Sequence, residues 1–195
     1  MAEKMAAEGQ KKEPLLMLKF LSHGTLEAVD LDKTRQFYEE VLGLDVVRTS
    51  PISLMIKLGG HNTIAVVKSK KTQVMPLLAH NGLDVGSREE VDQAYEVVLR
   101  EKDKWGITKV TKPVDQHGTR SFYFLDLDNN WWEILANPEG GYSWMFDKGR
   151  DIAEWGAGEG KGFNPNDYAK TAFADKEKRR IEAGGGLVEA ADGKE

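Results

Sequence analysis

Two stretches of the sequence share one pattern: residues 23–42 read HGTLEAVDLDKTRQFYEEVL, and residues 80–99 read HNGLDVGSREEVDQAYEVVL. Each begins with a histidine, carries a leucine three positions later and a tyrosine fifteen positions later, and ends on Val-Leu. Self-similarity of this kind indicates a structural unit that occurs twice. The repeat therefore predicts two modules with His23 and His80 at equivalent positions.

The same order of secondary structure is expected in each half. In the first, an apolar strand precedes a helix that stops at Gly43, and Pro51 helps to divide the following residues into short strands. In the second, Ser87 and Glu90 form a capping box in front of a helical stripe of apolar residues. The predicted strands are 18–29, 44–49, 53–58, 62–68, 77–85, 108–114, 120–125 and 131–136, and the predicted helices are 32–42 and one beginning after Ser87.

This order predicts an α+β fold, in which two βαβββ modules pair into a curved mixed sheet around a metal cleft. Equivalent positions of the two modules would then face each other, so that His23 and His80 could reach one ion. The predicted divisions are a flexible tail at 1–14, a domain at 15–137 with modules at about 15–70 and 76–137, and a C-terminal extension at 138–195. The extension contains an aromatic segment, Tyr142–Phe146, which is expected to pack over the core, a partner subunit or the cleft, and a charged helix.

Composition limits the classes of function. Hydrophobic residues make up 40% of the 195 residues, and a net charge of −5 argues against a nucleic-acid partner. There is no apolar run long enough to span a membrane and no signal peptide at the N-terminus, which favours a cytoplasmic location. Because cysteine is absent, a metal would be held by histidine or carboxylate side chains.

Three segments carry a resemblance to a known family: LSHGTLEAVDLDKTRQFYEEVLGL at 21–44, AHNGLDVGSREEVDQAY at 79–95 and SFYFLDLDNNWWEI at 121–134. They resemble the vicinal oxygen chelate superfamily, which includes glyoxalases, fosfomycin-modifying enzymes and extradiol dioxygenases. The resemblance implies metal ligands at His23, His80 and Glu133.

One turn departs from the pattern of that family, whose usual Asp-Pro-Asp-Gly-Asn reads Asp-Leu-Asp-Asn-Asn at 126–130. Asn129 tolerates a positive φ, so we expect the turn to be kept. Each ligand taken alone has an ordinary alternative, because a single histidine on a strand is more often packed or at the surface.

The number of ligands separates branches of the superfamily. Two histidines and one carboxylate leave open coordination positions, as in non-haem Fe(II) oxygenases. The sequence has no Asp or Glu between Asp45 and Asp84, so a fourth carboxylate ligand from the first module is not expected. His61 remains open as a ligand.

Resemblance to extradiol dioxygenases also implies an acid–base histidine at His61 and a substrate-orienting tyrosine at Tyr123, ten positions before Glu133. The alternatives are that His61 is a turn residue and that Tyr123 packs in the core. His117 is a further polar candidate, with a plain loop position as its alternative.

Three functions follow, in order of preference. The first is an Fe(II)-dependent, alternatively Mn(II)-dependent, extradiol dioxygenase that cleaves a catechol-like substrate with O₂. The second is a metal-dependent transferase or lyase of the fosfomycin-resistance or glyoxalase type, acting on a small anionic molecule. The third is a binding protein like the bleomycin-binding relatives, which generally lack the three ligands. A homodimer is compatible with the resemblance.

Overall fold

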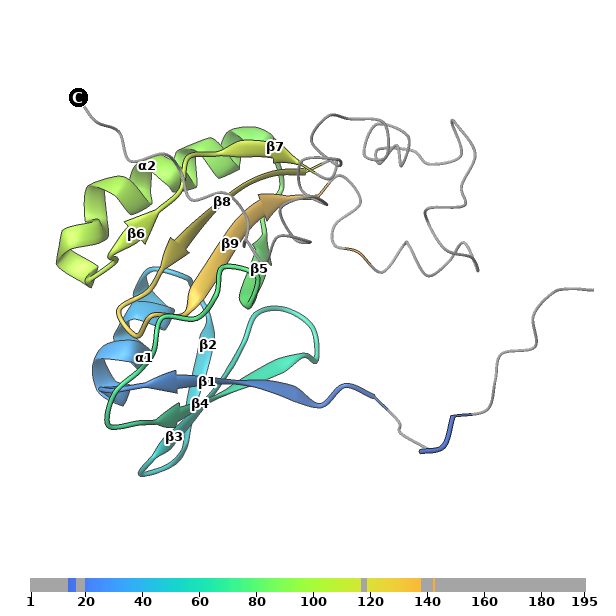
Figure 1. The fold of residues 1–195 in the computed structure, drawn as a ribbon, viewed down its shortest axis with the longest axis vertical. Coiled ribbons are helices and arrows are strands. Elements are labelled where there is room, and N and C mark those ends of the chain that lie inside the picture. The colour runs from blue at the N-terminus through green and yellow to red at the C-terminus, as the bar shows by residue number, and fades with distance from the viewer. Residues whose placement is uncertain (1–13, 17–19, 117–118, 138–141, 143–195) are drawn as a thin grey trace, which may run out of the picture.

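The computed structural model describes residues 14–16, 20–116, 119–137 and 142. In this described part of the chain, each of the two helices follows one strand and precedes several more, as Figure 1 shows. In the first module these are β1 (His23–Ala28), α1 (Leu31–Glu40), β2 (Asp45–Ser50), β3 (Ser53–Lys57) and β4 (Thr63–Lys68). In the second they are β5 (His80–Asp84), α2 (Arg88–Trp105), β6 (Lys109–Val110), β7 (Val114–Gln116), β8 (Thr119–Leu125) and β9 (Trp131–Ala136).

Each module builds its own sheet. Sheet A has the order β1-β4-β3-β2, and sheet B has the order β5-β9-β8-β6, with β7 paired to β8. In both, the first strand of the module runs parallel to its last strand, and the remaining long pairs are antiparallel. This confirms the predicted α+β class, with two separate sheets in the described chain in place of one continuous sheet.

Local signals explain where the helices begin and end. The Asp30 carboxylate accepts from the backbone N–H groups of Asp32 and Lys33, and the Ser87 hydroxyl accepts from that of Glu90. Both are N-caps that satisfy free N–H groups of the first turn. Gly43 and Gly106 follow the helices with φ of 66° and 70°, a left-handed conformation that costs glycine little.

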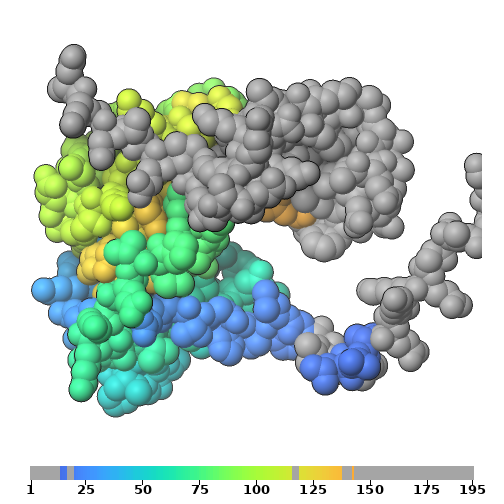
Figure 2. Space-filling view, in the orientation of Figure 1, coloured from blue at the N-terminus to red at the C-terminus, as the bar shows by residue number. Residues whose placement is uncertain are grey.

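The two modules share one hydrophobic core, which lies between the helix-facing sides of both sheets. Phe37 of α1 stacks edge-on against Phe124 of β8 and Trp105 of α2, with ring centroids 6.5 Å and 6.0 Å away. Figure 2 shows the modules in contact along one side of the molecule. Since both sheets turn one face toward this core, their opposite faces point away from it.

A buried polar turn joins the modules. Asp126, in the β8–β9 turn, accepts hydrogen bonds from the Tyr38 hydroxyl at 3.1 Å and from the Trp132 indole at 2.9 Å. Asp128 accepts from the Thr34 hydroxyl at 2.6 Å. Asn129 has φ of 66°, as the sequence predicts. The turn therefore holds α1 against sheet B through buried carboxylates.

Most of the predicted tail 1–14 and of the extension 138–195 lies outside the described residues, as does His117. Tyr142 is the only described member of the predicted aromatic segment, and its side chain is partly exposed. No helix in the described part of the chain has the length and apolar character needed to cross a membrane.

Candidate metal centre

The side chains of interest lie on the face of sheet B that points away from the helices, here called the site face. Side chains alternate along a strand, so paired residues stand together on one face. Glu133 of β9 pairs with Gly82 of β5 on one side and with Tyr123 of β8 on the other. The site face consists of His80, Gly82, Asp84, Ser121, Tyr123, Leu125, Trp131, Glu133 and Leu135.

His80 and Glu133 form a pair at the centre of this face. His80 Nε2 lies 3.3 Å from Glu133 Oε2. The other ring nitrogen, Nδ1, lies 2.7 Å from the carbonyl oxygen of Leu77. Since a carbonyl can only accept, Nδ1 carries a proton and donates it, so Nε2 is the nitrogen that faces Glu133 and that could bind a metal ion after losing its own proton.

Glu133 is buried and held on two sides. The residue is only 8% exposed, and the Tyr123 hydroxyl donates to Oε1 at 2.6 Å. The Tyr123 ring also meets the His80 ring edge-on, with centroids 5.1 Å apart. These contacts fix the carboxylate so that its second oxygen, Oε2, faces His80.

The pKa shifts of His80 and Glu133 both favour the charged form of each residue. The hydrogen bond to Glu133 raises the pKa of His80 despite burial, with a smaller contribution from the Leu77 carbonyl. Burial alone would raise the pKa of Glu133, but hydrogen bonds from His80, Tyr123 and Ser121 together lower it. Glu133 is therefore a carboxylate at neutral pH, the form in which it can ligate a cation.

The donor chemistry of this pair fits a divalent metal. Two ligand atoms that each lie about 2.1 Å from an ion at a right angle are about 3 Å apart. The 3.3 Å between His80 Nε2 and Glu133 Oε2 is close to that spacing. An imidazole and a carboxylate together suit first-row ions such as Fe(II) and Mn(II).

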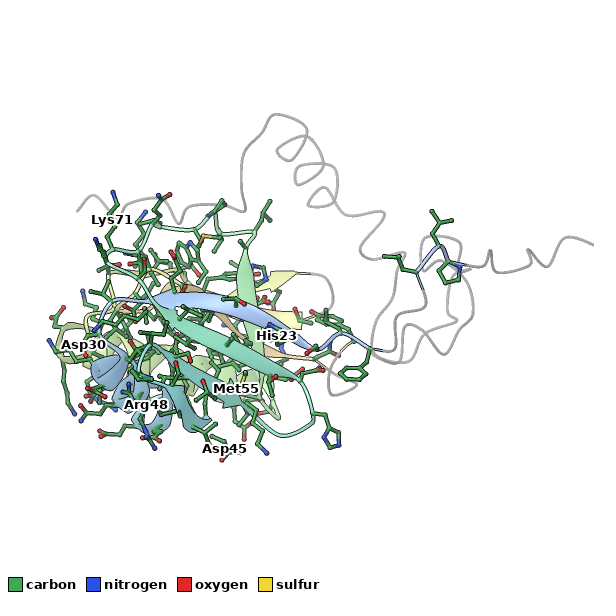
Figure 3. The ribbon with its side chains drawn as sticks, turned by 90° about the horizontal axis from the view of Figure 1, so that it is seen from below. His23, Asp30, Asp45, Arg48, Met55 and Lys71 are labelled. Atoms are coloured by element: carbon green, nitrogen blue, oxygen red, sulfur yellow. The ribbon has the colours of Figure 1, made fainter. Side chains whose placement is uncertain are left out.

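His23 does not join this pair within the described chain. It is exposed at the start of β1, where its Nδ1 lies 3.1 Å from the Ser22 hydroxyl. Figure 3 shows sheet A in front with His23 labelled. Among the described residues there is no group of three His, Cys, Asp or Glu side chains that could hold a metal ion.

His23 nevertheless occupies a defined face. Leu26 and Ala28 of β1 pack into the core, so the alternate residues of β1 point the other way. We call this side of sheet A its outer face. The register of the strands assigns to it His23, Thr25, Glu27, Ser53, Met55, Lys57, Thr63, Ala65 and Val67.

The equivalent strand pairing in the two modules shows which ligand the first module lacks. Thr25, two residues after His23, pairs with Ala65, just as Gly82, two residues after His80, pairs with Glu133. Ala65 is thus the counterpart of Glu133 in the first module, and alanine has no ligand atom. This places no carboxylate at the position from which the first module could supply a fourth ligand.

His61 precedes β4 in the turn after β3 and is exposed. Because His23 pairs with Thr63 in parallel strands, His61 lies at the same end of sheet A as His23. The Leu77 carbonyl is a contact that sequence reasoning missed, and a backbone acceptor leaves no residue-type signal by which to find it.

Comparisons with known proteins bear on this geometry. A model of the Glyoxalase/Bleomycin resistance protein/Dioxygenase superfamily matches residues 21–134, which include both modules and all the predicted ligands. The chain belongs to this superfamily. The predicted membership of the vicinal oxygen chelate superfamily is confirmed. No curated protein matches the chain.

Solved structures of superfamily members are similar over the two modules. The genomically encoded fosfomycin resistance protein FosX of Listeria monocytogenes, solved with Mn(II) and sulfate, is 25% identical with a TM-score of 0.52, covering 69% of this chain and 100% of FosX. A hypothetical protein of S. aureus is 26% identical with a TM-score of 0.50, covering 62% and 94%. A possible glyoxalase of Bacillus cereus is 22% identical with a TM-score of 0.50, covering 61% and 100%, a likeness of fold alone.

Proposed function

We propose that this vicinal oxygen chelate protein is a metal-dependent dioxygenase that opens a catechol-like ring with O₂, using His23, His80 and Glu133 as ligands of Fe(II) or, alternatively, Mn(II). The observation that carries the proposal is the fixed His80–Glu133 pair beside an apolar wall, with Ala65 at the counterpart of Glu133. When bound, the ion would supply open coordination positions and the redox chemistry that O₂ requires.

The surroundings of the pair favour a flat, weakly charged substrate. Tyr123 packs with Leu125, Trp131 and Leu77 on the site face. Aromatic and aliphatic side chains of this kind bind a ring by burying its apolar surface. Arg120, the cation on the same strand, points to the helix side and pairs with Asp92 at 2.7 Å. This set favours a catechol over a phosphonate.

Tyr123 and His61 receive the roles predicted from the sequence. The Tyr123 hydroxyl already donates to Glu133, but its oxygen keeps lone pairs that can accept from a substrate hydroxyl. His61 lies at the His23 end of sheet A, so it would approach the site together with that ligand. There it would take and return substrate protons as an acid–base group.

The third ligand would come from a second copy of the chain. The helix-facing sides of sheets A and B share one core, so the site face and the outer face of one molecule turn away from it. In a symmetric dimer, the outer face of one copy can cover the site face of the other, which brings His23 to His80 and Glu133 twice. This arrangement also covers Val47, which is 58% exposed on sheet A.

A transferase or lyase of the fosfomycin-resistance type is the second candidate. It is favoured by one observation, the likeness to FosX, whose structure was solved with Mn(II). The same three ligands would serve either reaction, so the geometry of the pair does not separate the two candidates. They differ in the substrate.

Metal analysis and substrate screening test the proposal. Protein purified without oxygen should contain iron or manganese, and the Fe(II) form should consume O₂ in the presence of a catechol from a broad panel. Fosfomycin turnover with Mn(II), and no catechol-dependent uptake of O₂, would replace the dioxygenase with the second candidate. Absence of metal after reconstitution would refute both.

Ligand variants test where the third ligand comes from. His23→Ala, His80→Ala and Glu133→Ala should each lose stoichiometric metal and keep the fold. A mixture of His23→Ala and Glu133→Ala chains should regain part of the metal and activity, because each mixed dimer has an intact site made from His23 of one copy and Glu133 of the other. A mixture as empty as its components would show that the ligands belong to one chain.

A further inference from the structure

The connection between the modules, residues 69–79, runs along sheet B before it enters β5. In Figure 1 it passes the β8–β9 turn on its way from β4 to β5. Two side chains of sheet B hold it there: Asn129 donates to the Thr72 hydroxyl at 3.1 Å, and the Trp131 indole donates to the carbonyl of Met75 at 2.9 Å. A segment without helix or strand is thus tied to the strand that carries Glu133.

Trp131 is well suited to hold this segment. It is only 6% exposed, and its indole N–H is the single polar group of the side chain. A buried indole without a hydrogen-bond partner would lose free energy, so the Met75 carbonyl is held where the indole can reach it. The side chains of Val74 and Met75 are 56% and 44% exposed, so they contribute little to holding the segment in place.

A short turn carries this placement to His80. The backbone N–H of Ala79 donates to the carbonyl of Pro76 at 2.8 Å, which closes the turn directly after Met75. Within that turn, the Leu77 carbonyl accepts from His80 Nδ1 at 2.7 Å, and the Leu77 side chain packs against Trp131 and Tyr123. A continuous series of contacts therefore links the Trp131 indole to Nδ1 of His80, the ring nitrogen that faces away from Glu133.

We infer that Trp131 is a positioning residue for His80, which acts through the module connection by holding the Leu77 carbonyl against Nδ1–H and so keeping Nε2 aimed at Glu133. The inference rests on the proposed metal site. A neutral imidazole has two tautomers, and only the one with its proton on Nδ1 presents Nε2 to a metal ion. Partners that orient a ligand histidine typically change metal affinity 10–100-fold when they are removed.

The variant Trp131→Phe tests this in the full-length chain, because it keeps an aromatic ring and removes the indole donor. The direct readout is the Nδ1–H proton of His80 in metal-free protein, by its ¹H chemical shift and its rate of exchange with water, at a pH below the raised pKa of that residue. With four histidines in the chain, His80→Gln assigns the signal. We expect a downfield, slowly exchanging Nδ1–H in the wild type and faster exchange in the variant, together with about 10-fold weaker Mn(II) binding.

Thr72→Val is the matched control. It removes the other side-chain anchor of the connection, the acceptor of Asn129, at a point farther along the chain from His80. It should leave the Nδ1–H signal of His80 unchanged. If Trp131→Phe fails to fold, benzothienylalanine at the same position keeps the shape of the indole and lacks its N–H.

An unchanged Nδ1–H signal in a folded variant without the donor would overturn the inference, as would an equal loss in Thr72→Val. The Nδ1–H signal is read without metal. A wild type that shows the expected signal and binds no metal would therefore refute the proposed function and leave the positioning role of Trp131 standing.

Discussion

The outer face of sheet A and the site face of sheet B have the same strand order and the same register, yet they differ in burial and chemistry. On sheet B, Tyr123 and Glu133 are 5% and 8% exposed and bonded to each other. Their counterparts on sheet A are Met55 and Ala65, which offer neither the oxygen or nitrogen ligand that suits Fe(II) and Mn(II) nor a proton donor.

The difference shows how a repeated module can be divided between two tasks. Both modules keep a histidine at the start of the first strand, because the repeat places it there. Only the second has a carboxylate, Glu133, together with a hydroxyl, that of Tyr123, which holds the carboxylate in place. In the proposed site the second module therefore supplies an ordered pair of ligands, and the first supplies one ligand and an exposed surface.

The largest effect is expected at Asp126, in the buried turn that holds α1 against sheet B. Its two oxygens accept from Tyr38, Trp132 and backbone groups of the turn, so Asp126→Asn would leave at least two buried donors facing an amide N–H₂. We expect unfolding free energy to fall by about 2–4 kcal/mol. Urea denaturation measures this. Asp103→Asn, on the exposed side of α2, should change it by less than about 0.5 kcal/mol, and equal losses would contradict the account.

Ala65→Glu would make the two faces alike. A carboxylate at the counterpart of Glu133 adds a fourth ligand, so Mn(II) should bind at least about 10-fold more tightly, a gain of ~1.4 kcal/mol. Catechol-dependent O₂ uptake should fall, since an open coordination position is filled. Competition titration and an oxygen electrode measure the two.

Val67→Glu controls for the added charge, because Val67 lies on the same outer face, paired with Ser53 in the next row. It should alter neither metal affinity nor O₂ uptake. If Ala65→Glu behaves as Val67→Glu does, the first module does not reach the metal through this row.

Gly82→Ala would crowd the site face beside Glu133. The added Cβ would lie 3.2 Å from Leu135 Cδ2 and 3.7 Å from Glu133 Oε2. We expect a loss of about 1 kcal/mol in unfolding free energy and weaker metal binding, because the methyl group stands against the ligand oxygen. Gly24→Ala on sheet A meets only Ile64, at 4.0 Å, and should keep or slightly raise stability. Metal binding unaffected by Gly82→Ala would mean that Oε2 is not the ligand atom.

The smallest effect concerns the pH dependence of metal-free protein. The raised pKa of His80 contributes stability that is complete below its ordinary value of 6.5 and is lost as pH rises through the raised value. The lowered pKa of Glu133 contributes stability that is complete above 4.5 and is lost as pH falls through the lowered value. The stability difference between wild type and Glu133→Gln should therefore be largest between pH 4.5 and 6.5, as measured by denaturation with a chelator present. A difference independent of pH would show that the pair is not ionised.

Local patterns determined much of the fold. The caps at Ser87 and the glycine stop at Gly43 depend on residues within one turn, so they could be read from the sequence. The repeat predicted equivalent histidines because each half encodes the same unit. The positive φ of Asn129 followed from its place in the turn.

Element lengths depended on distant partners. Among the described residues of the strand predicted at 18–29, pairing is confined to His23–Ala28, because β4, its neighbour, extends from Thr63 to Lys68. The second helix continues to Trp105, beyond the apolar stripe that ends at Leu99, and Trp105 packs against Phe37 of the other module. The limit of the strand has no local signal, whereas the helix ends at Gly106, a glycine stop that lies beyond the apolar stripe.

The sequence by itself determined which residue types a metal site could use and that two modules would present them: His23, His80 and Glu133 were named from spacing and resemblance. Only the tertiary structure decided that His80 and Glu133 meet while His23 stands apart, because that depends on which faces of the two sheets share the core. It also decided which nitrogen of His80 faces Glu133, since the Leu77 carbonyl that holds the other nitrogen is a backbone group placed by the fold of the connection.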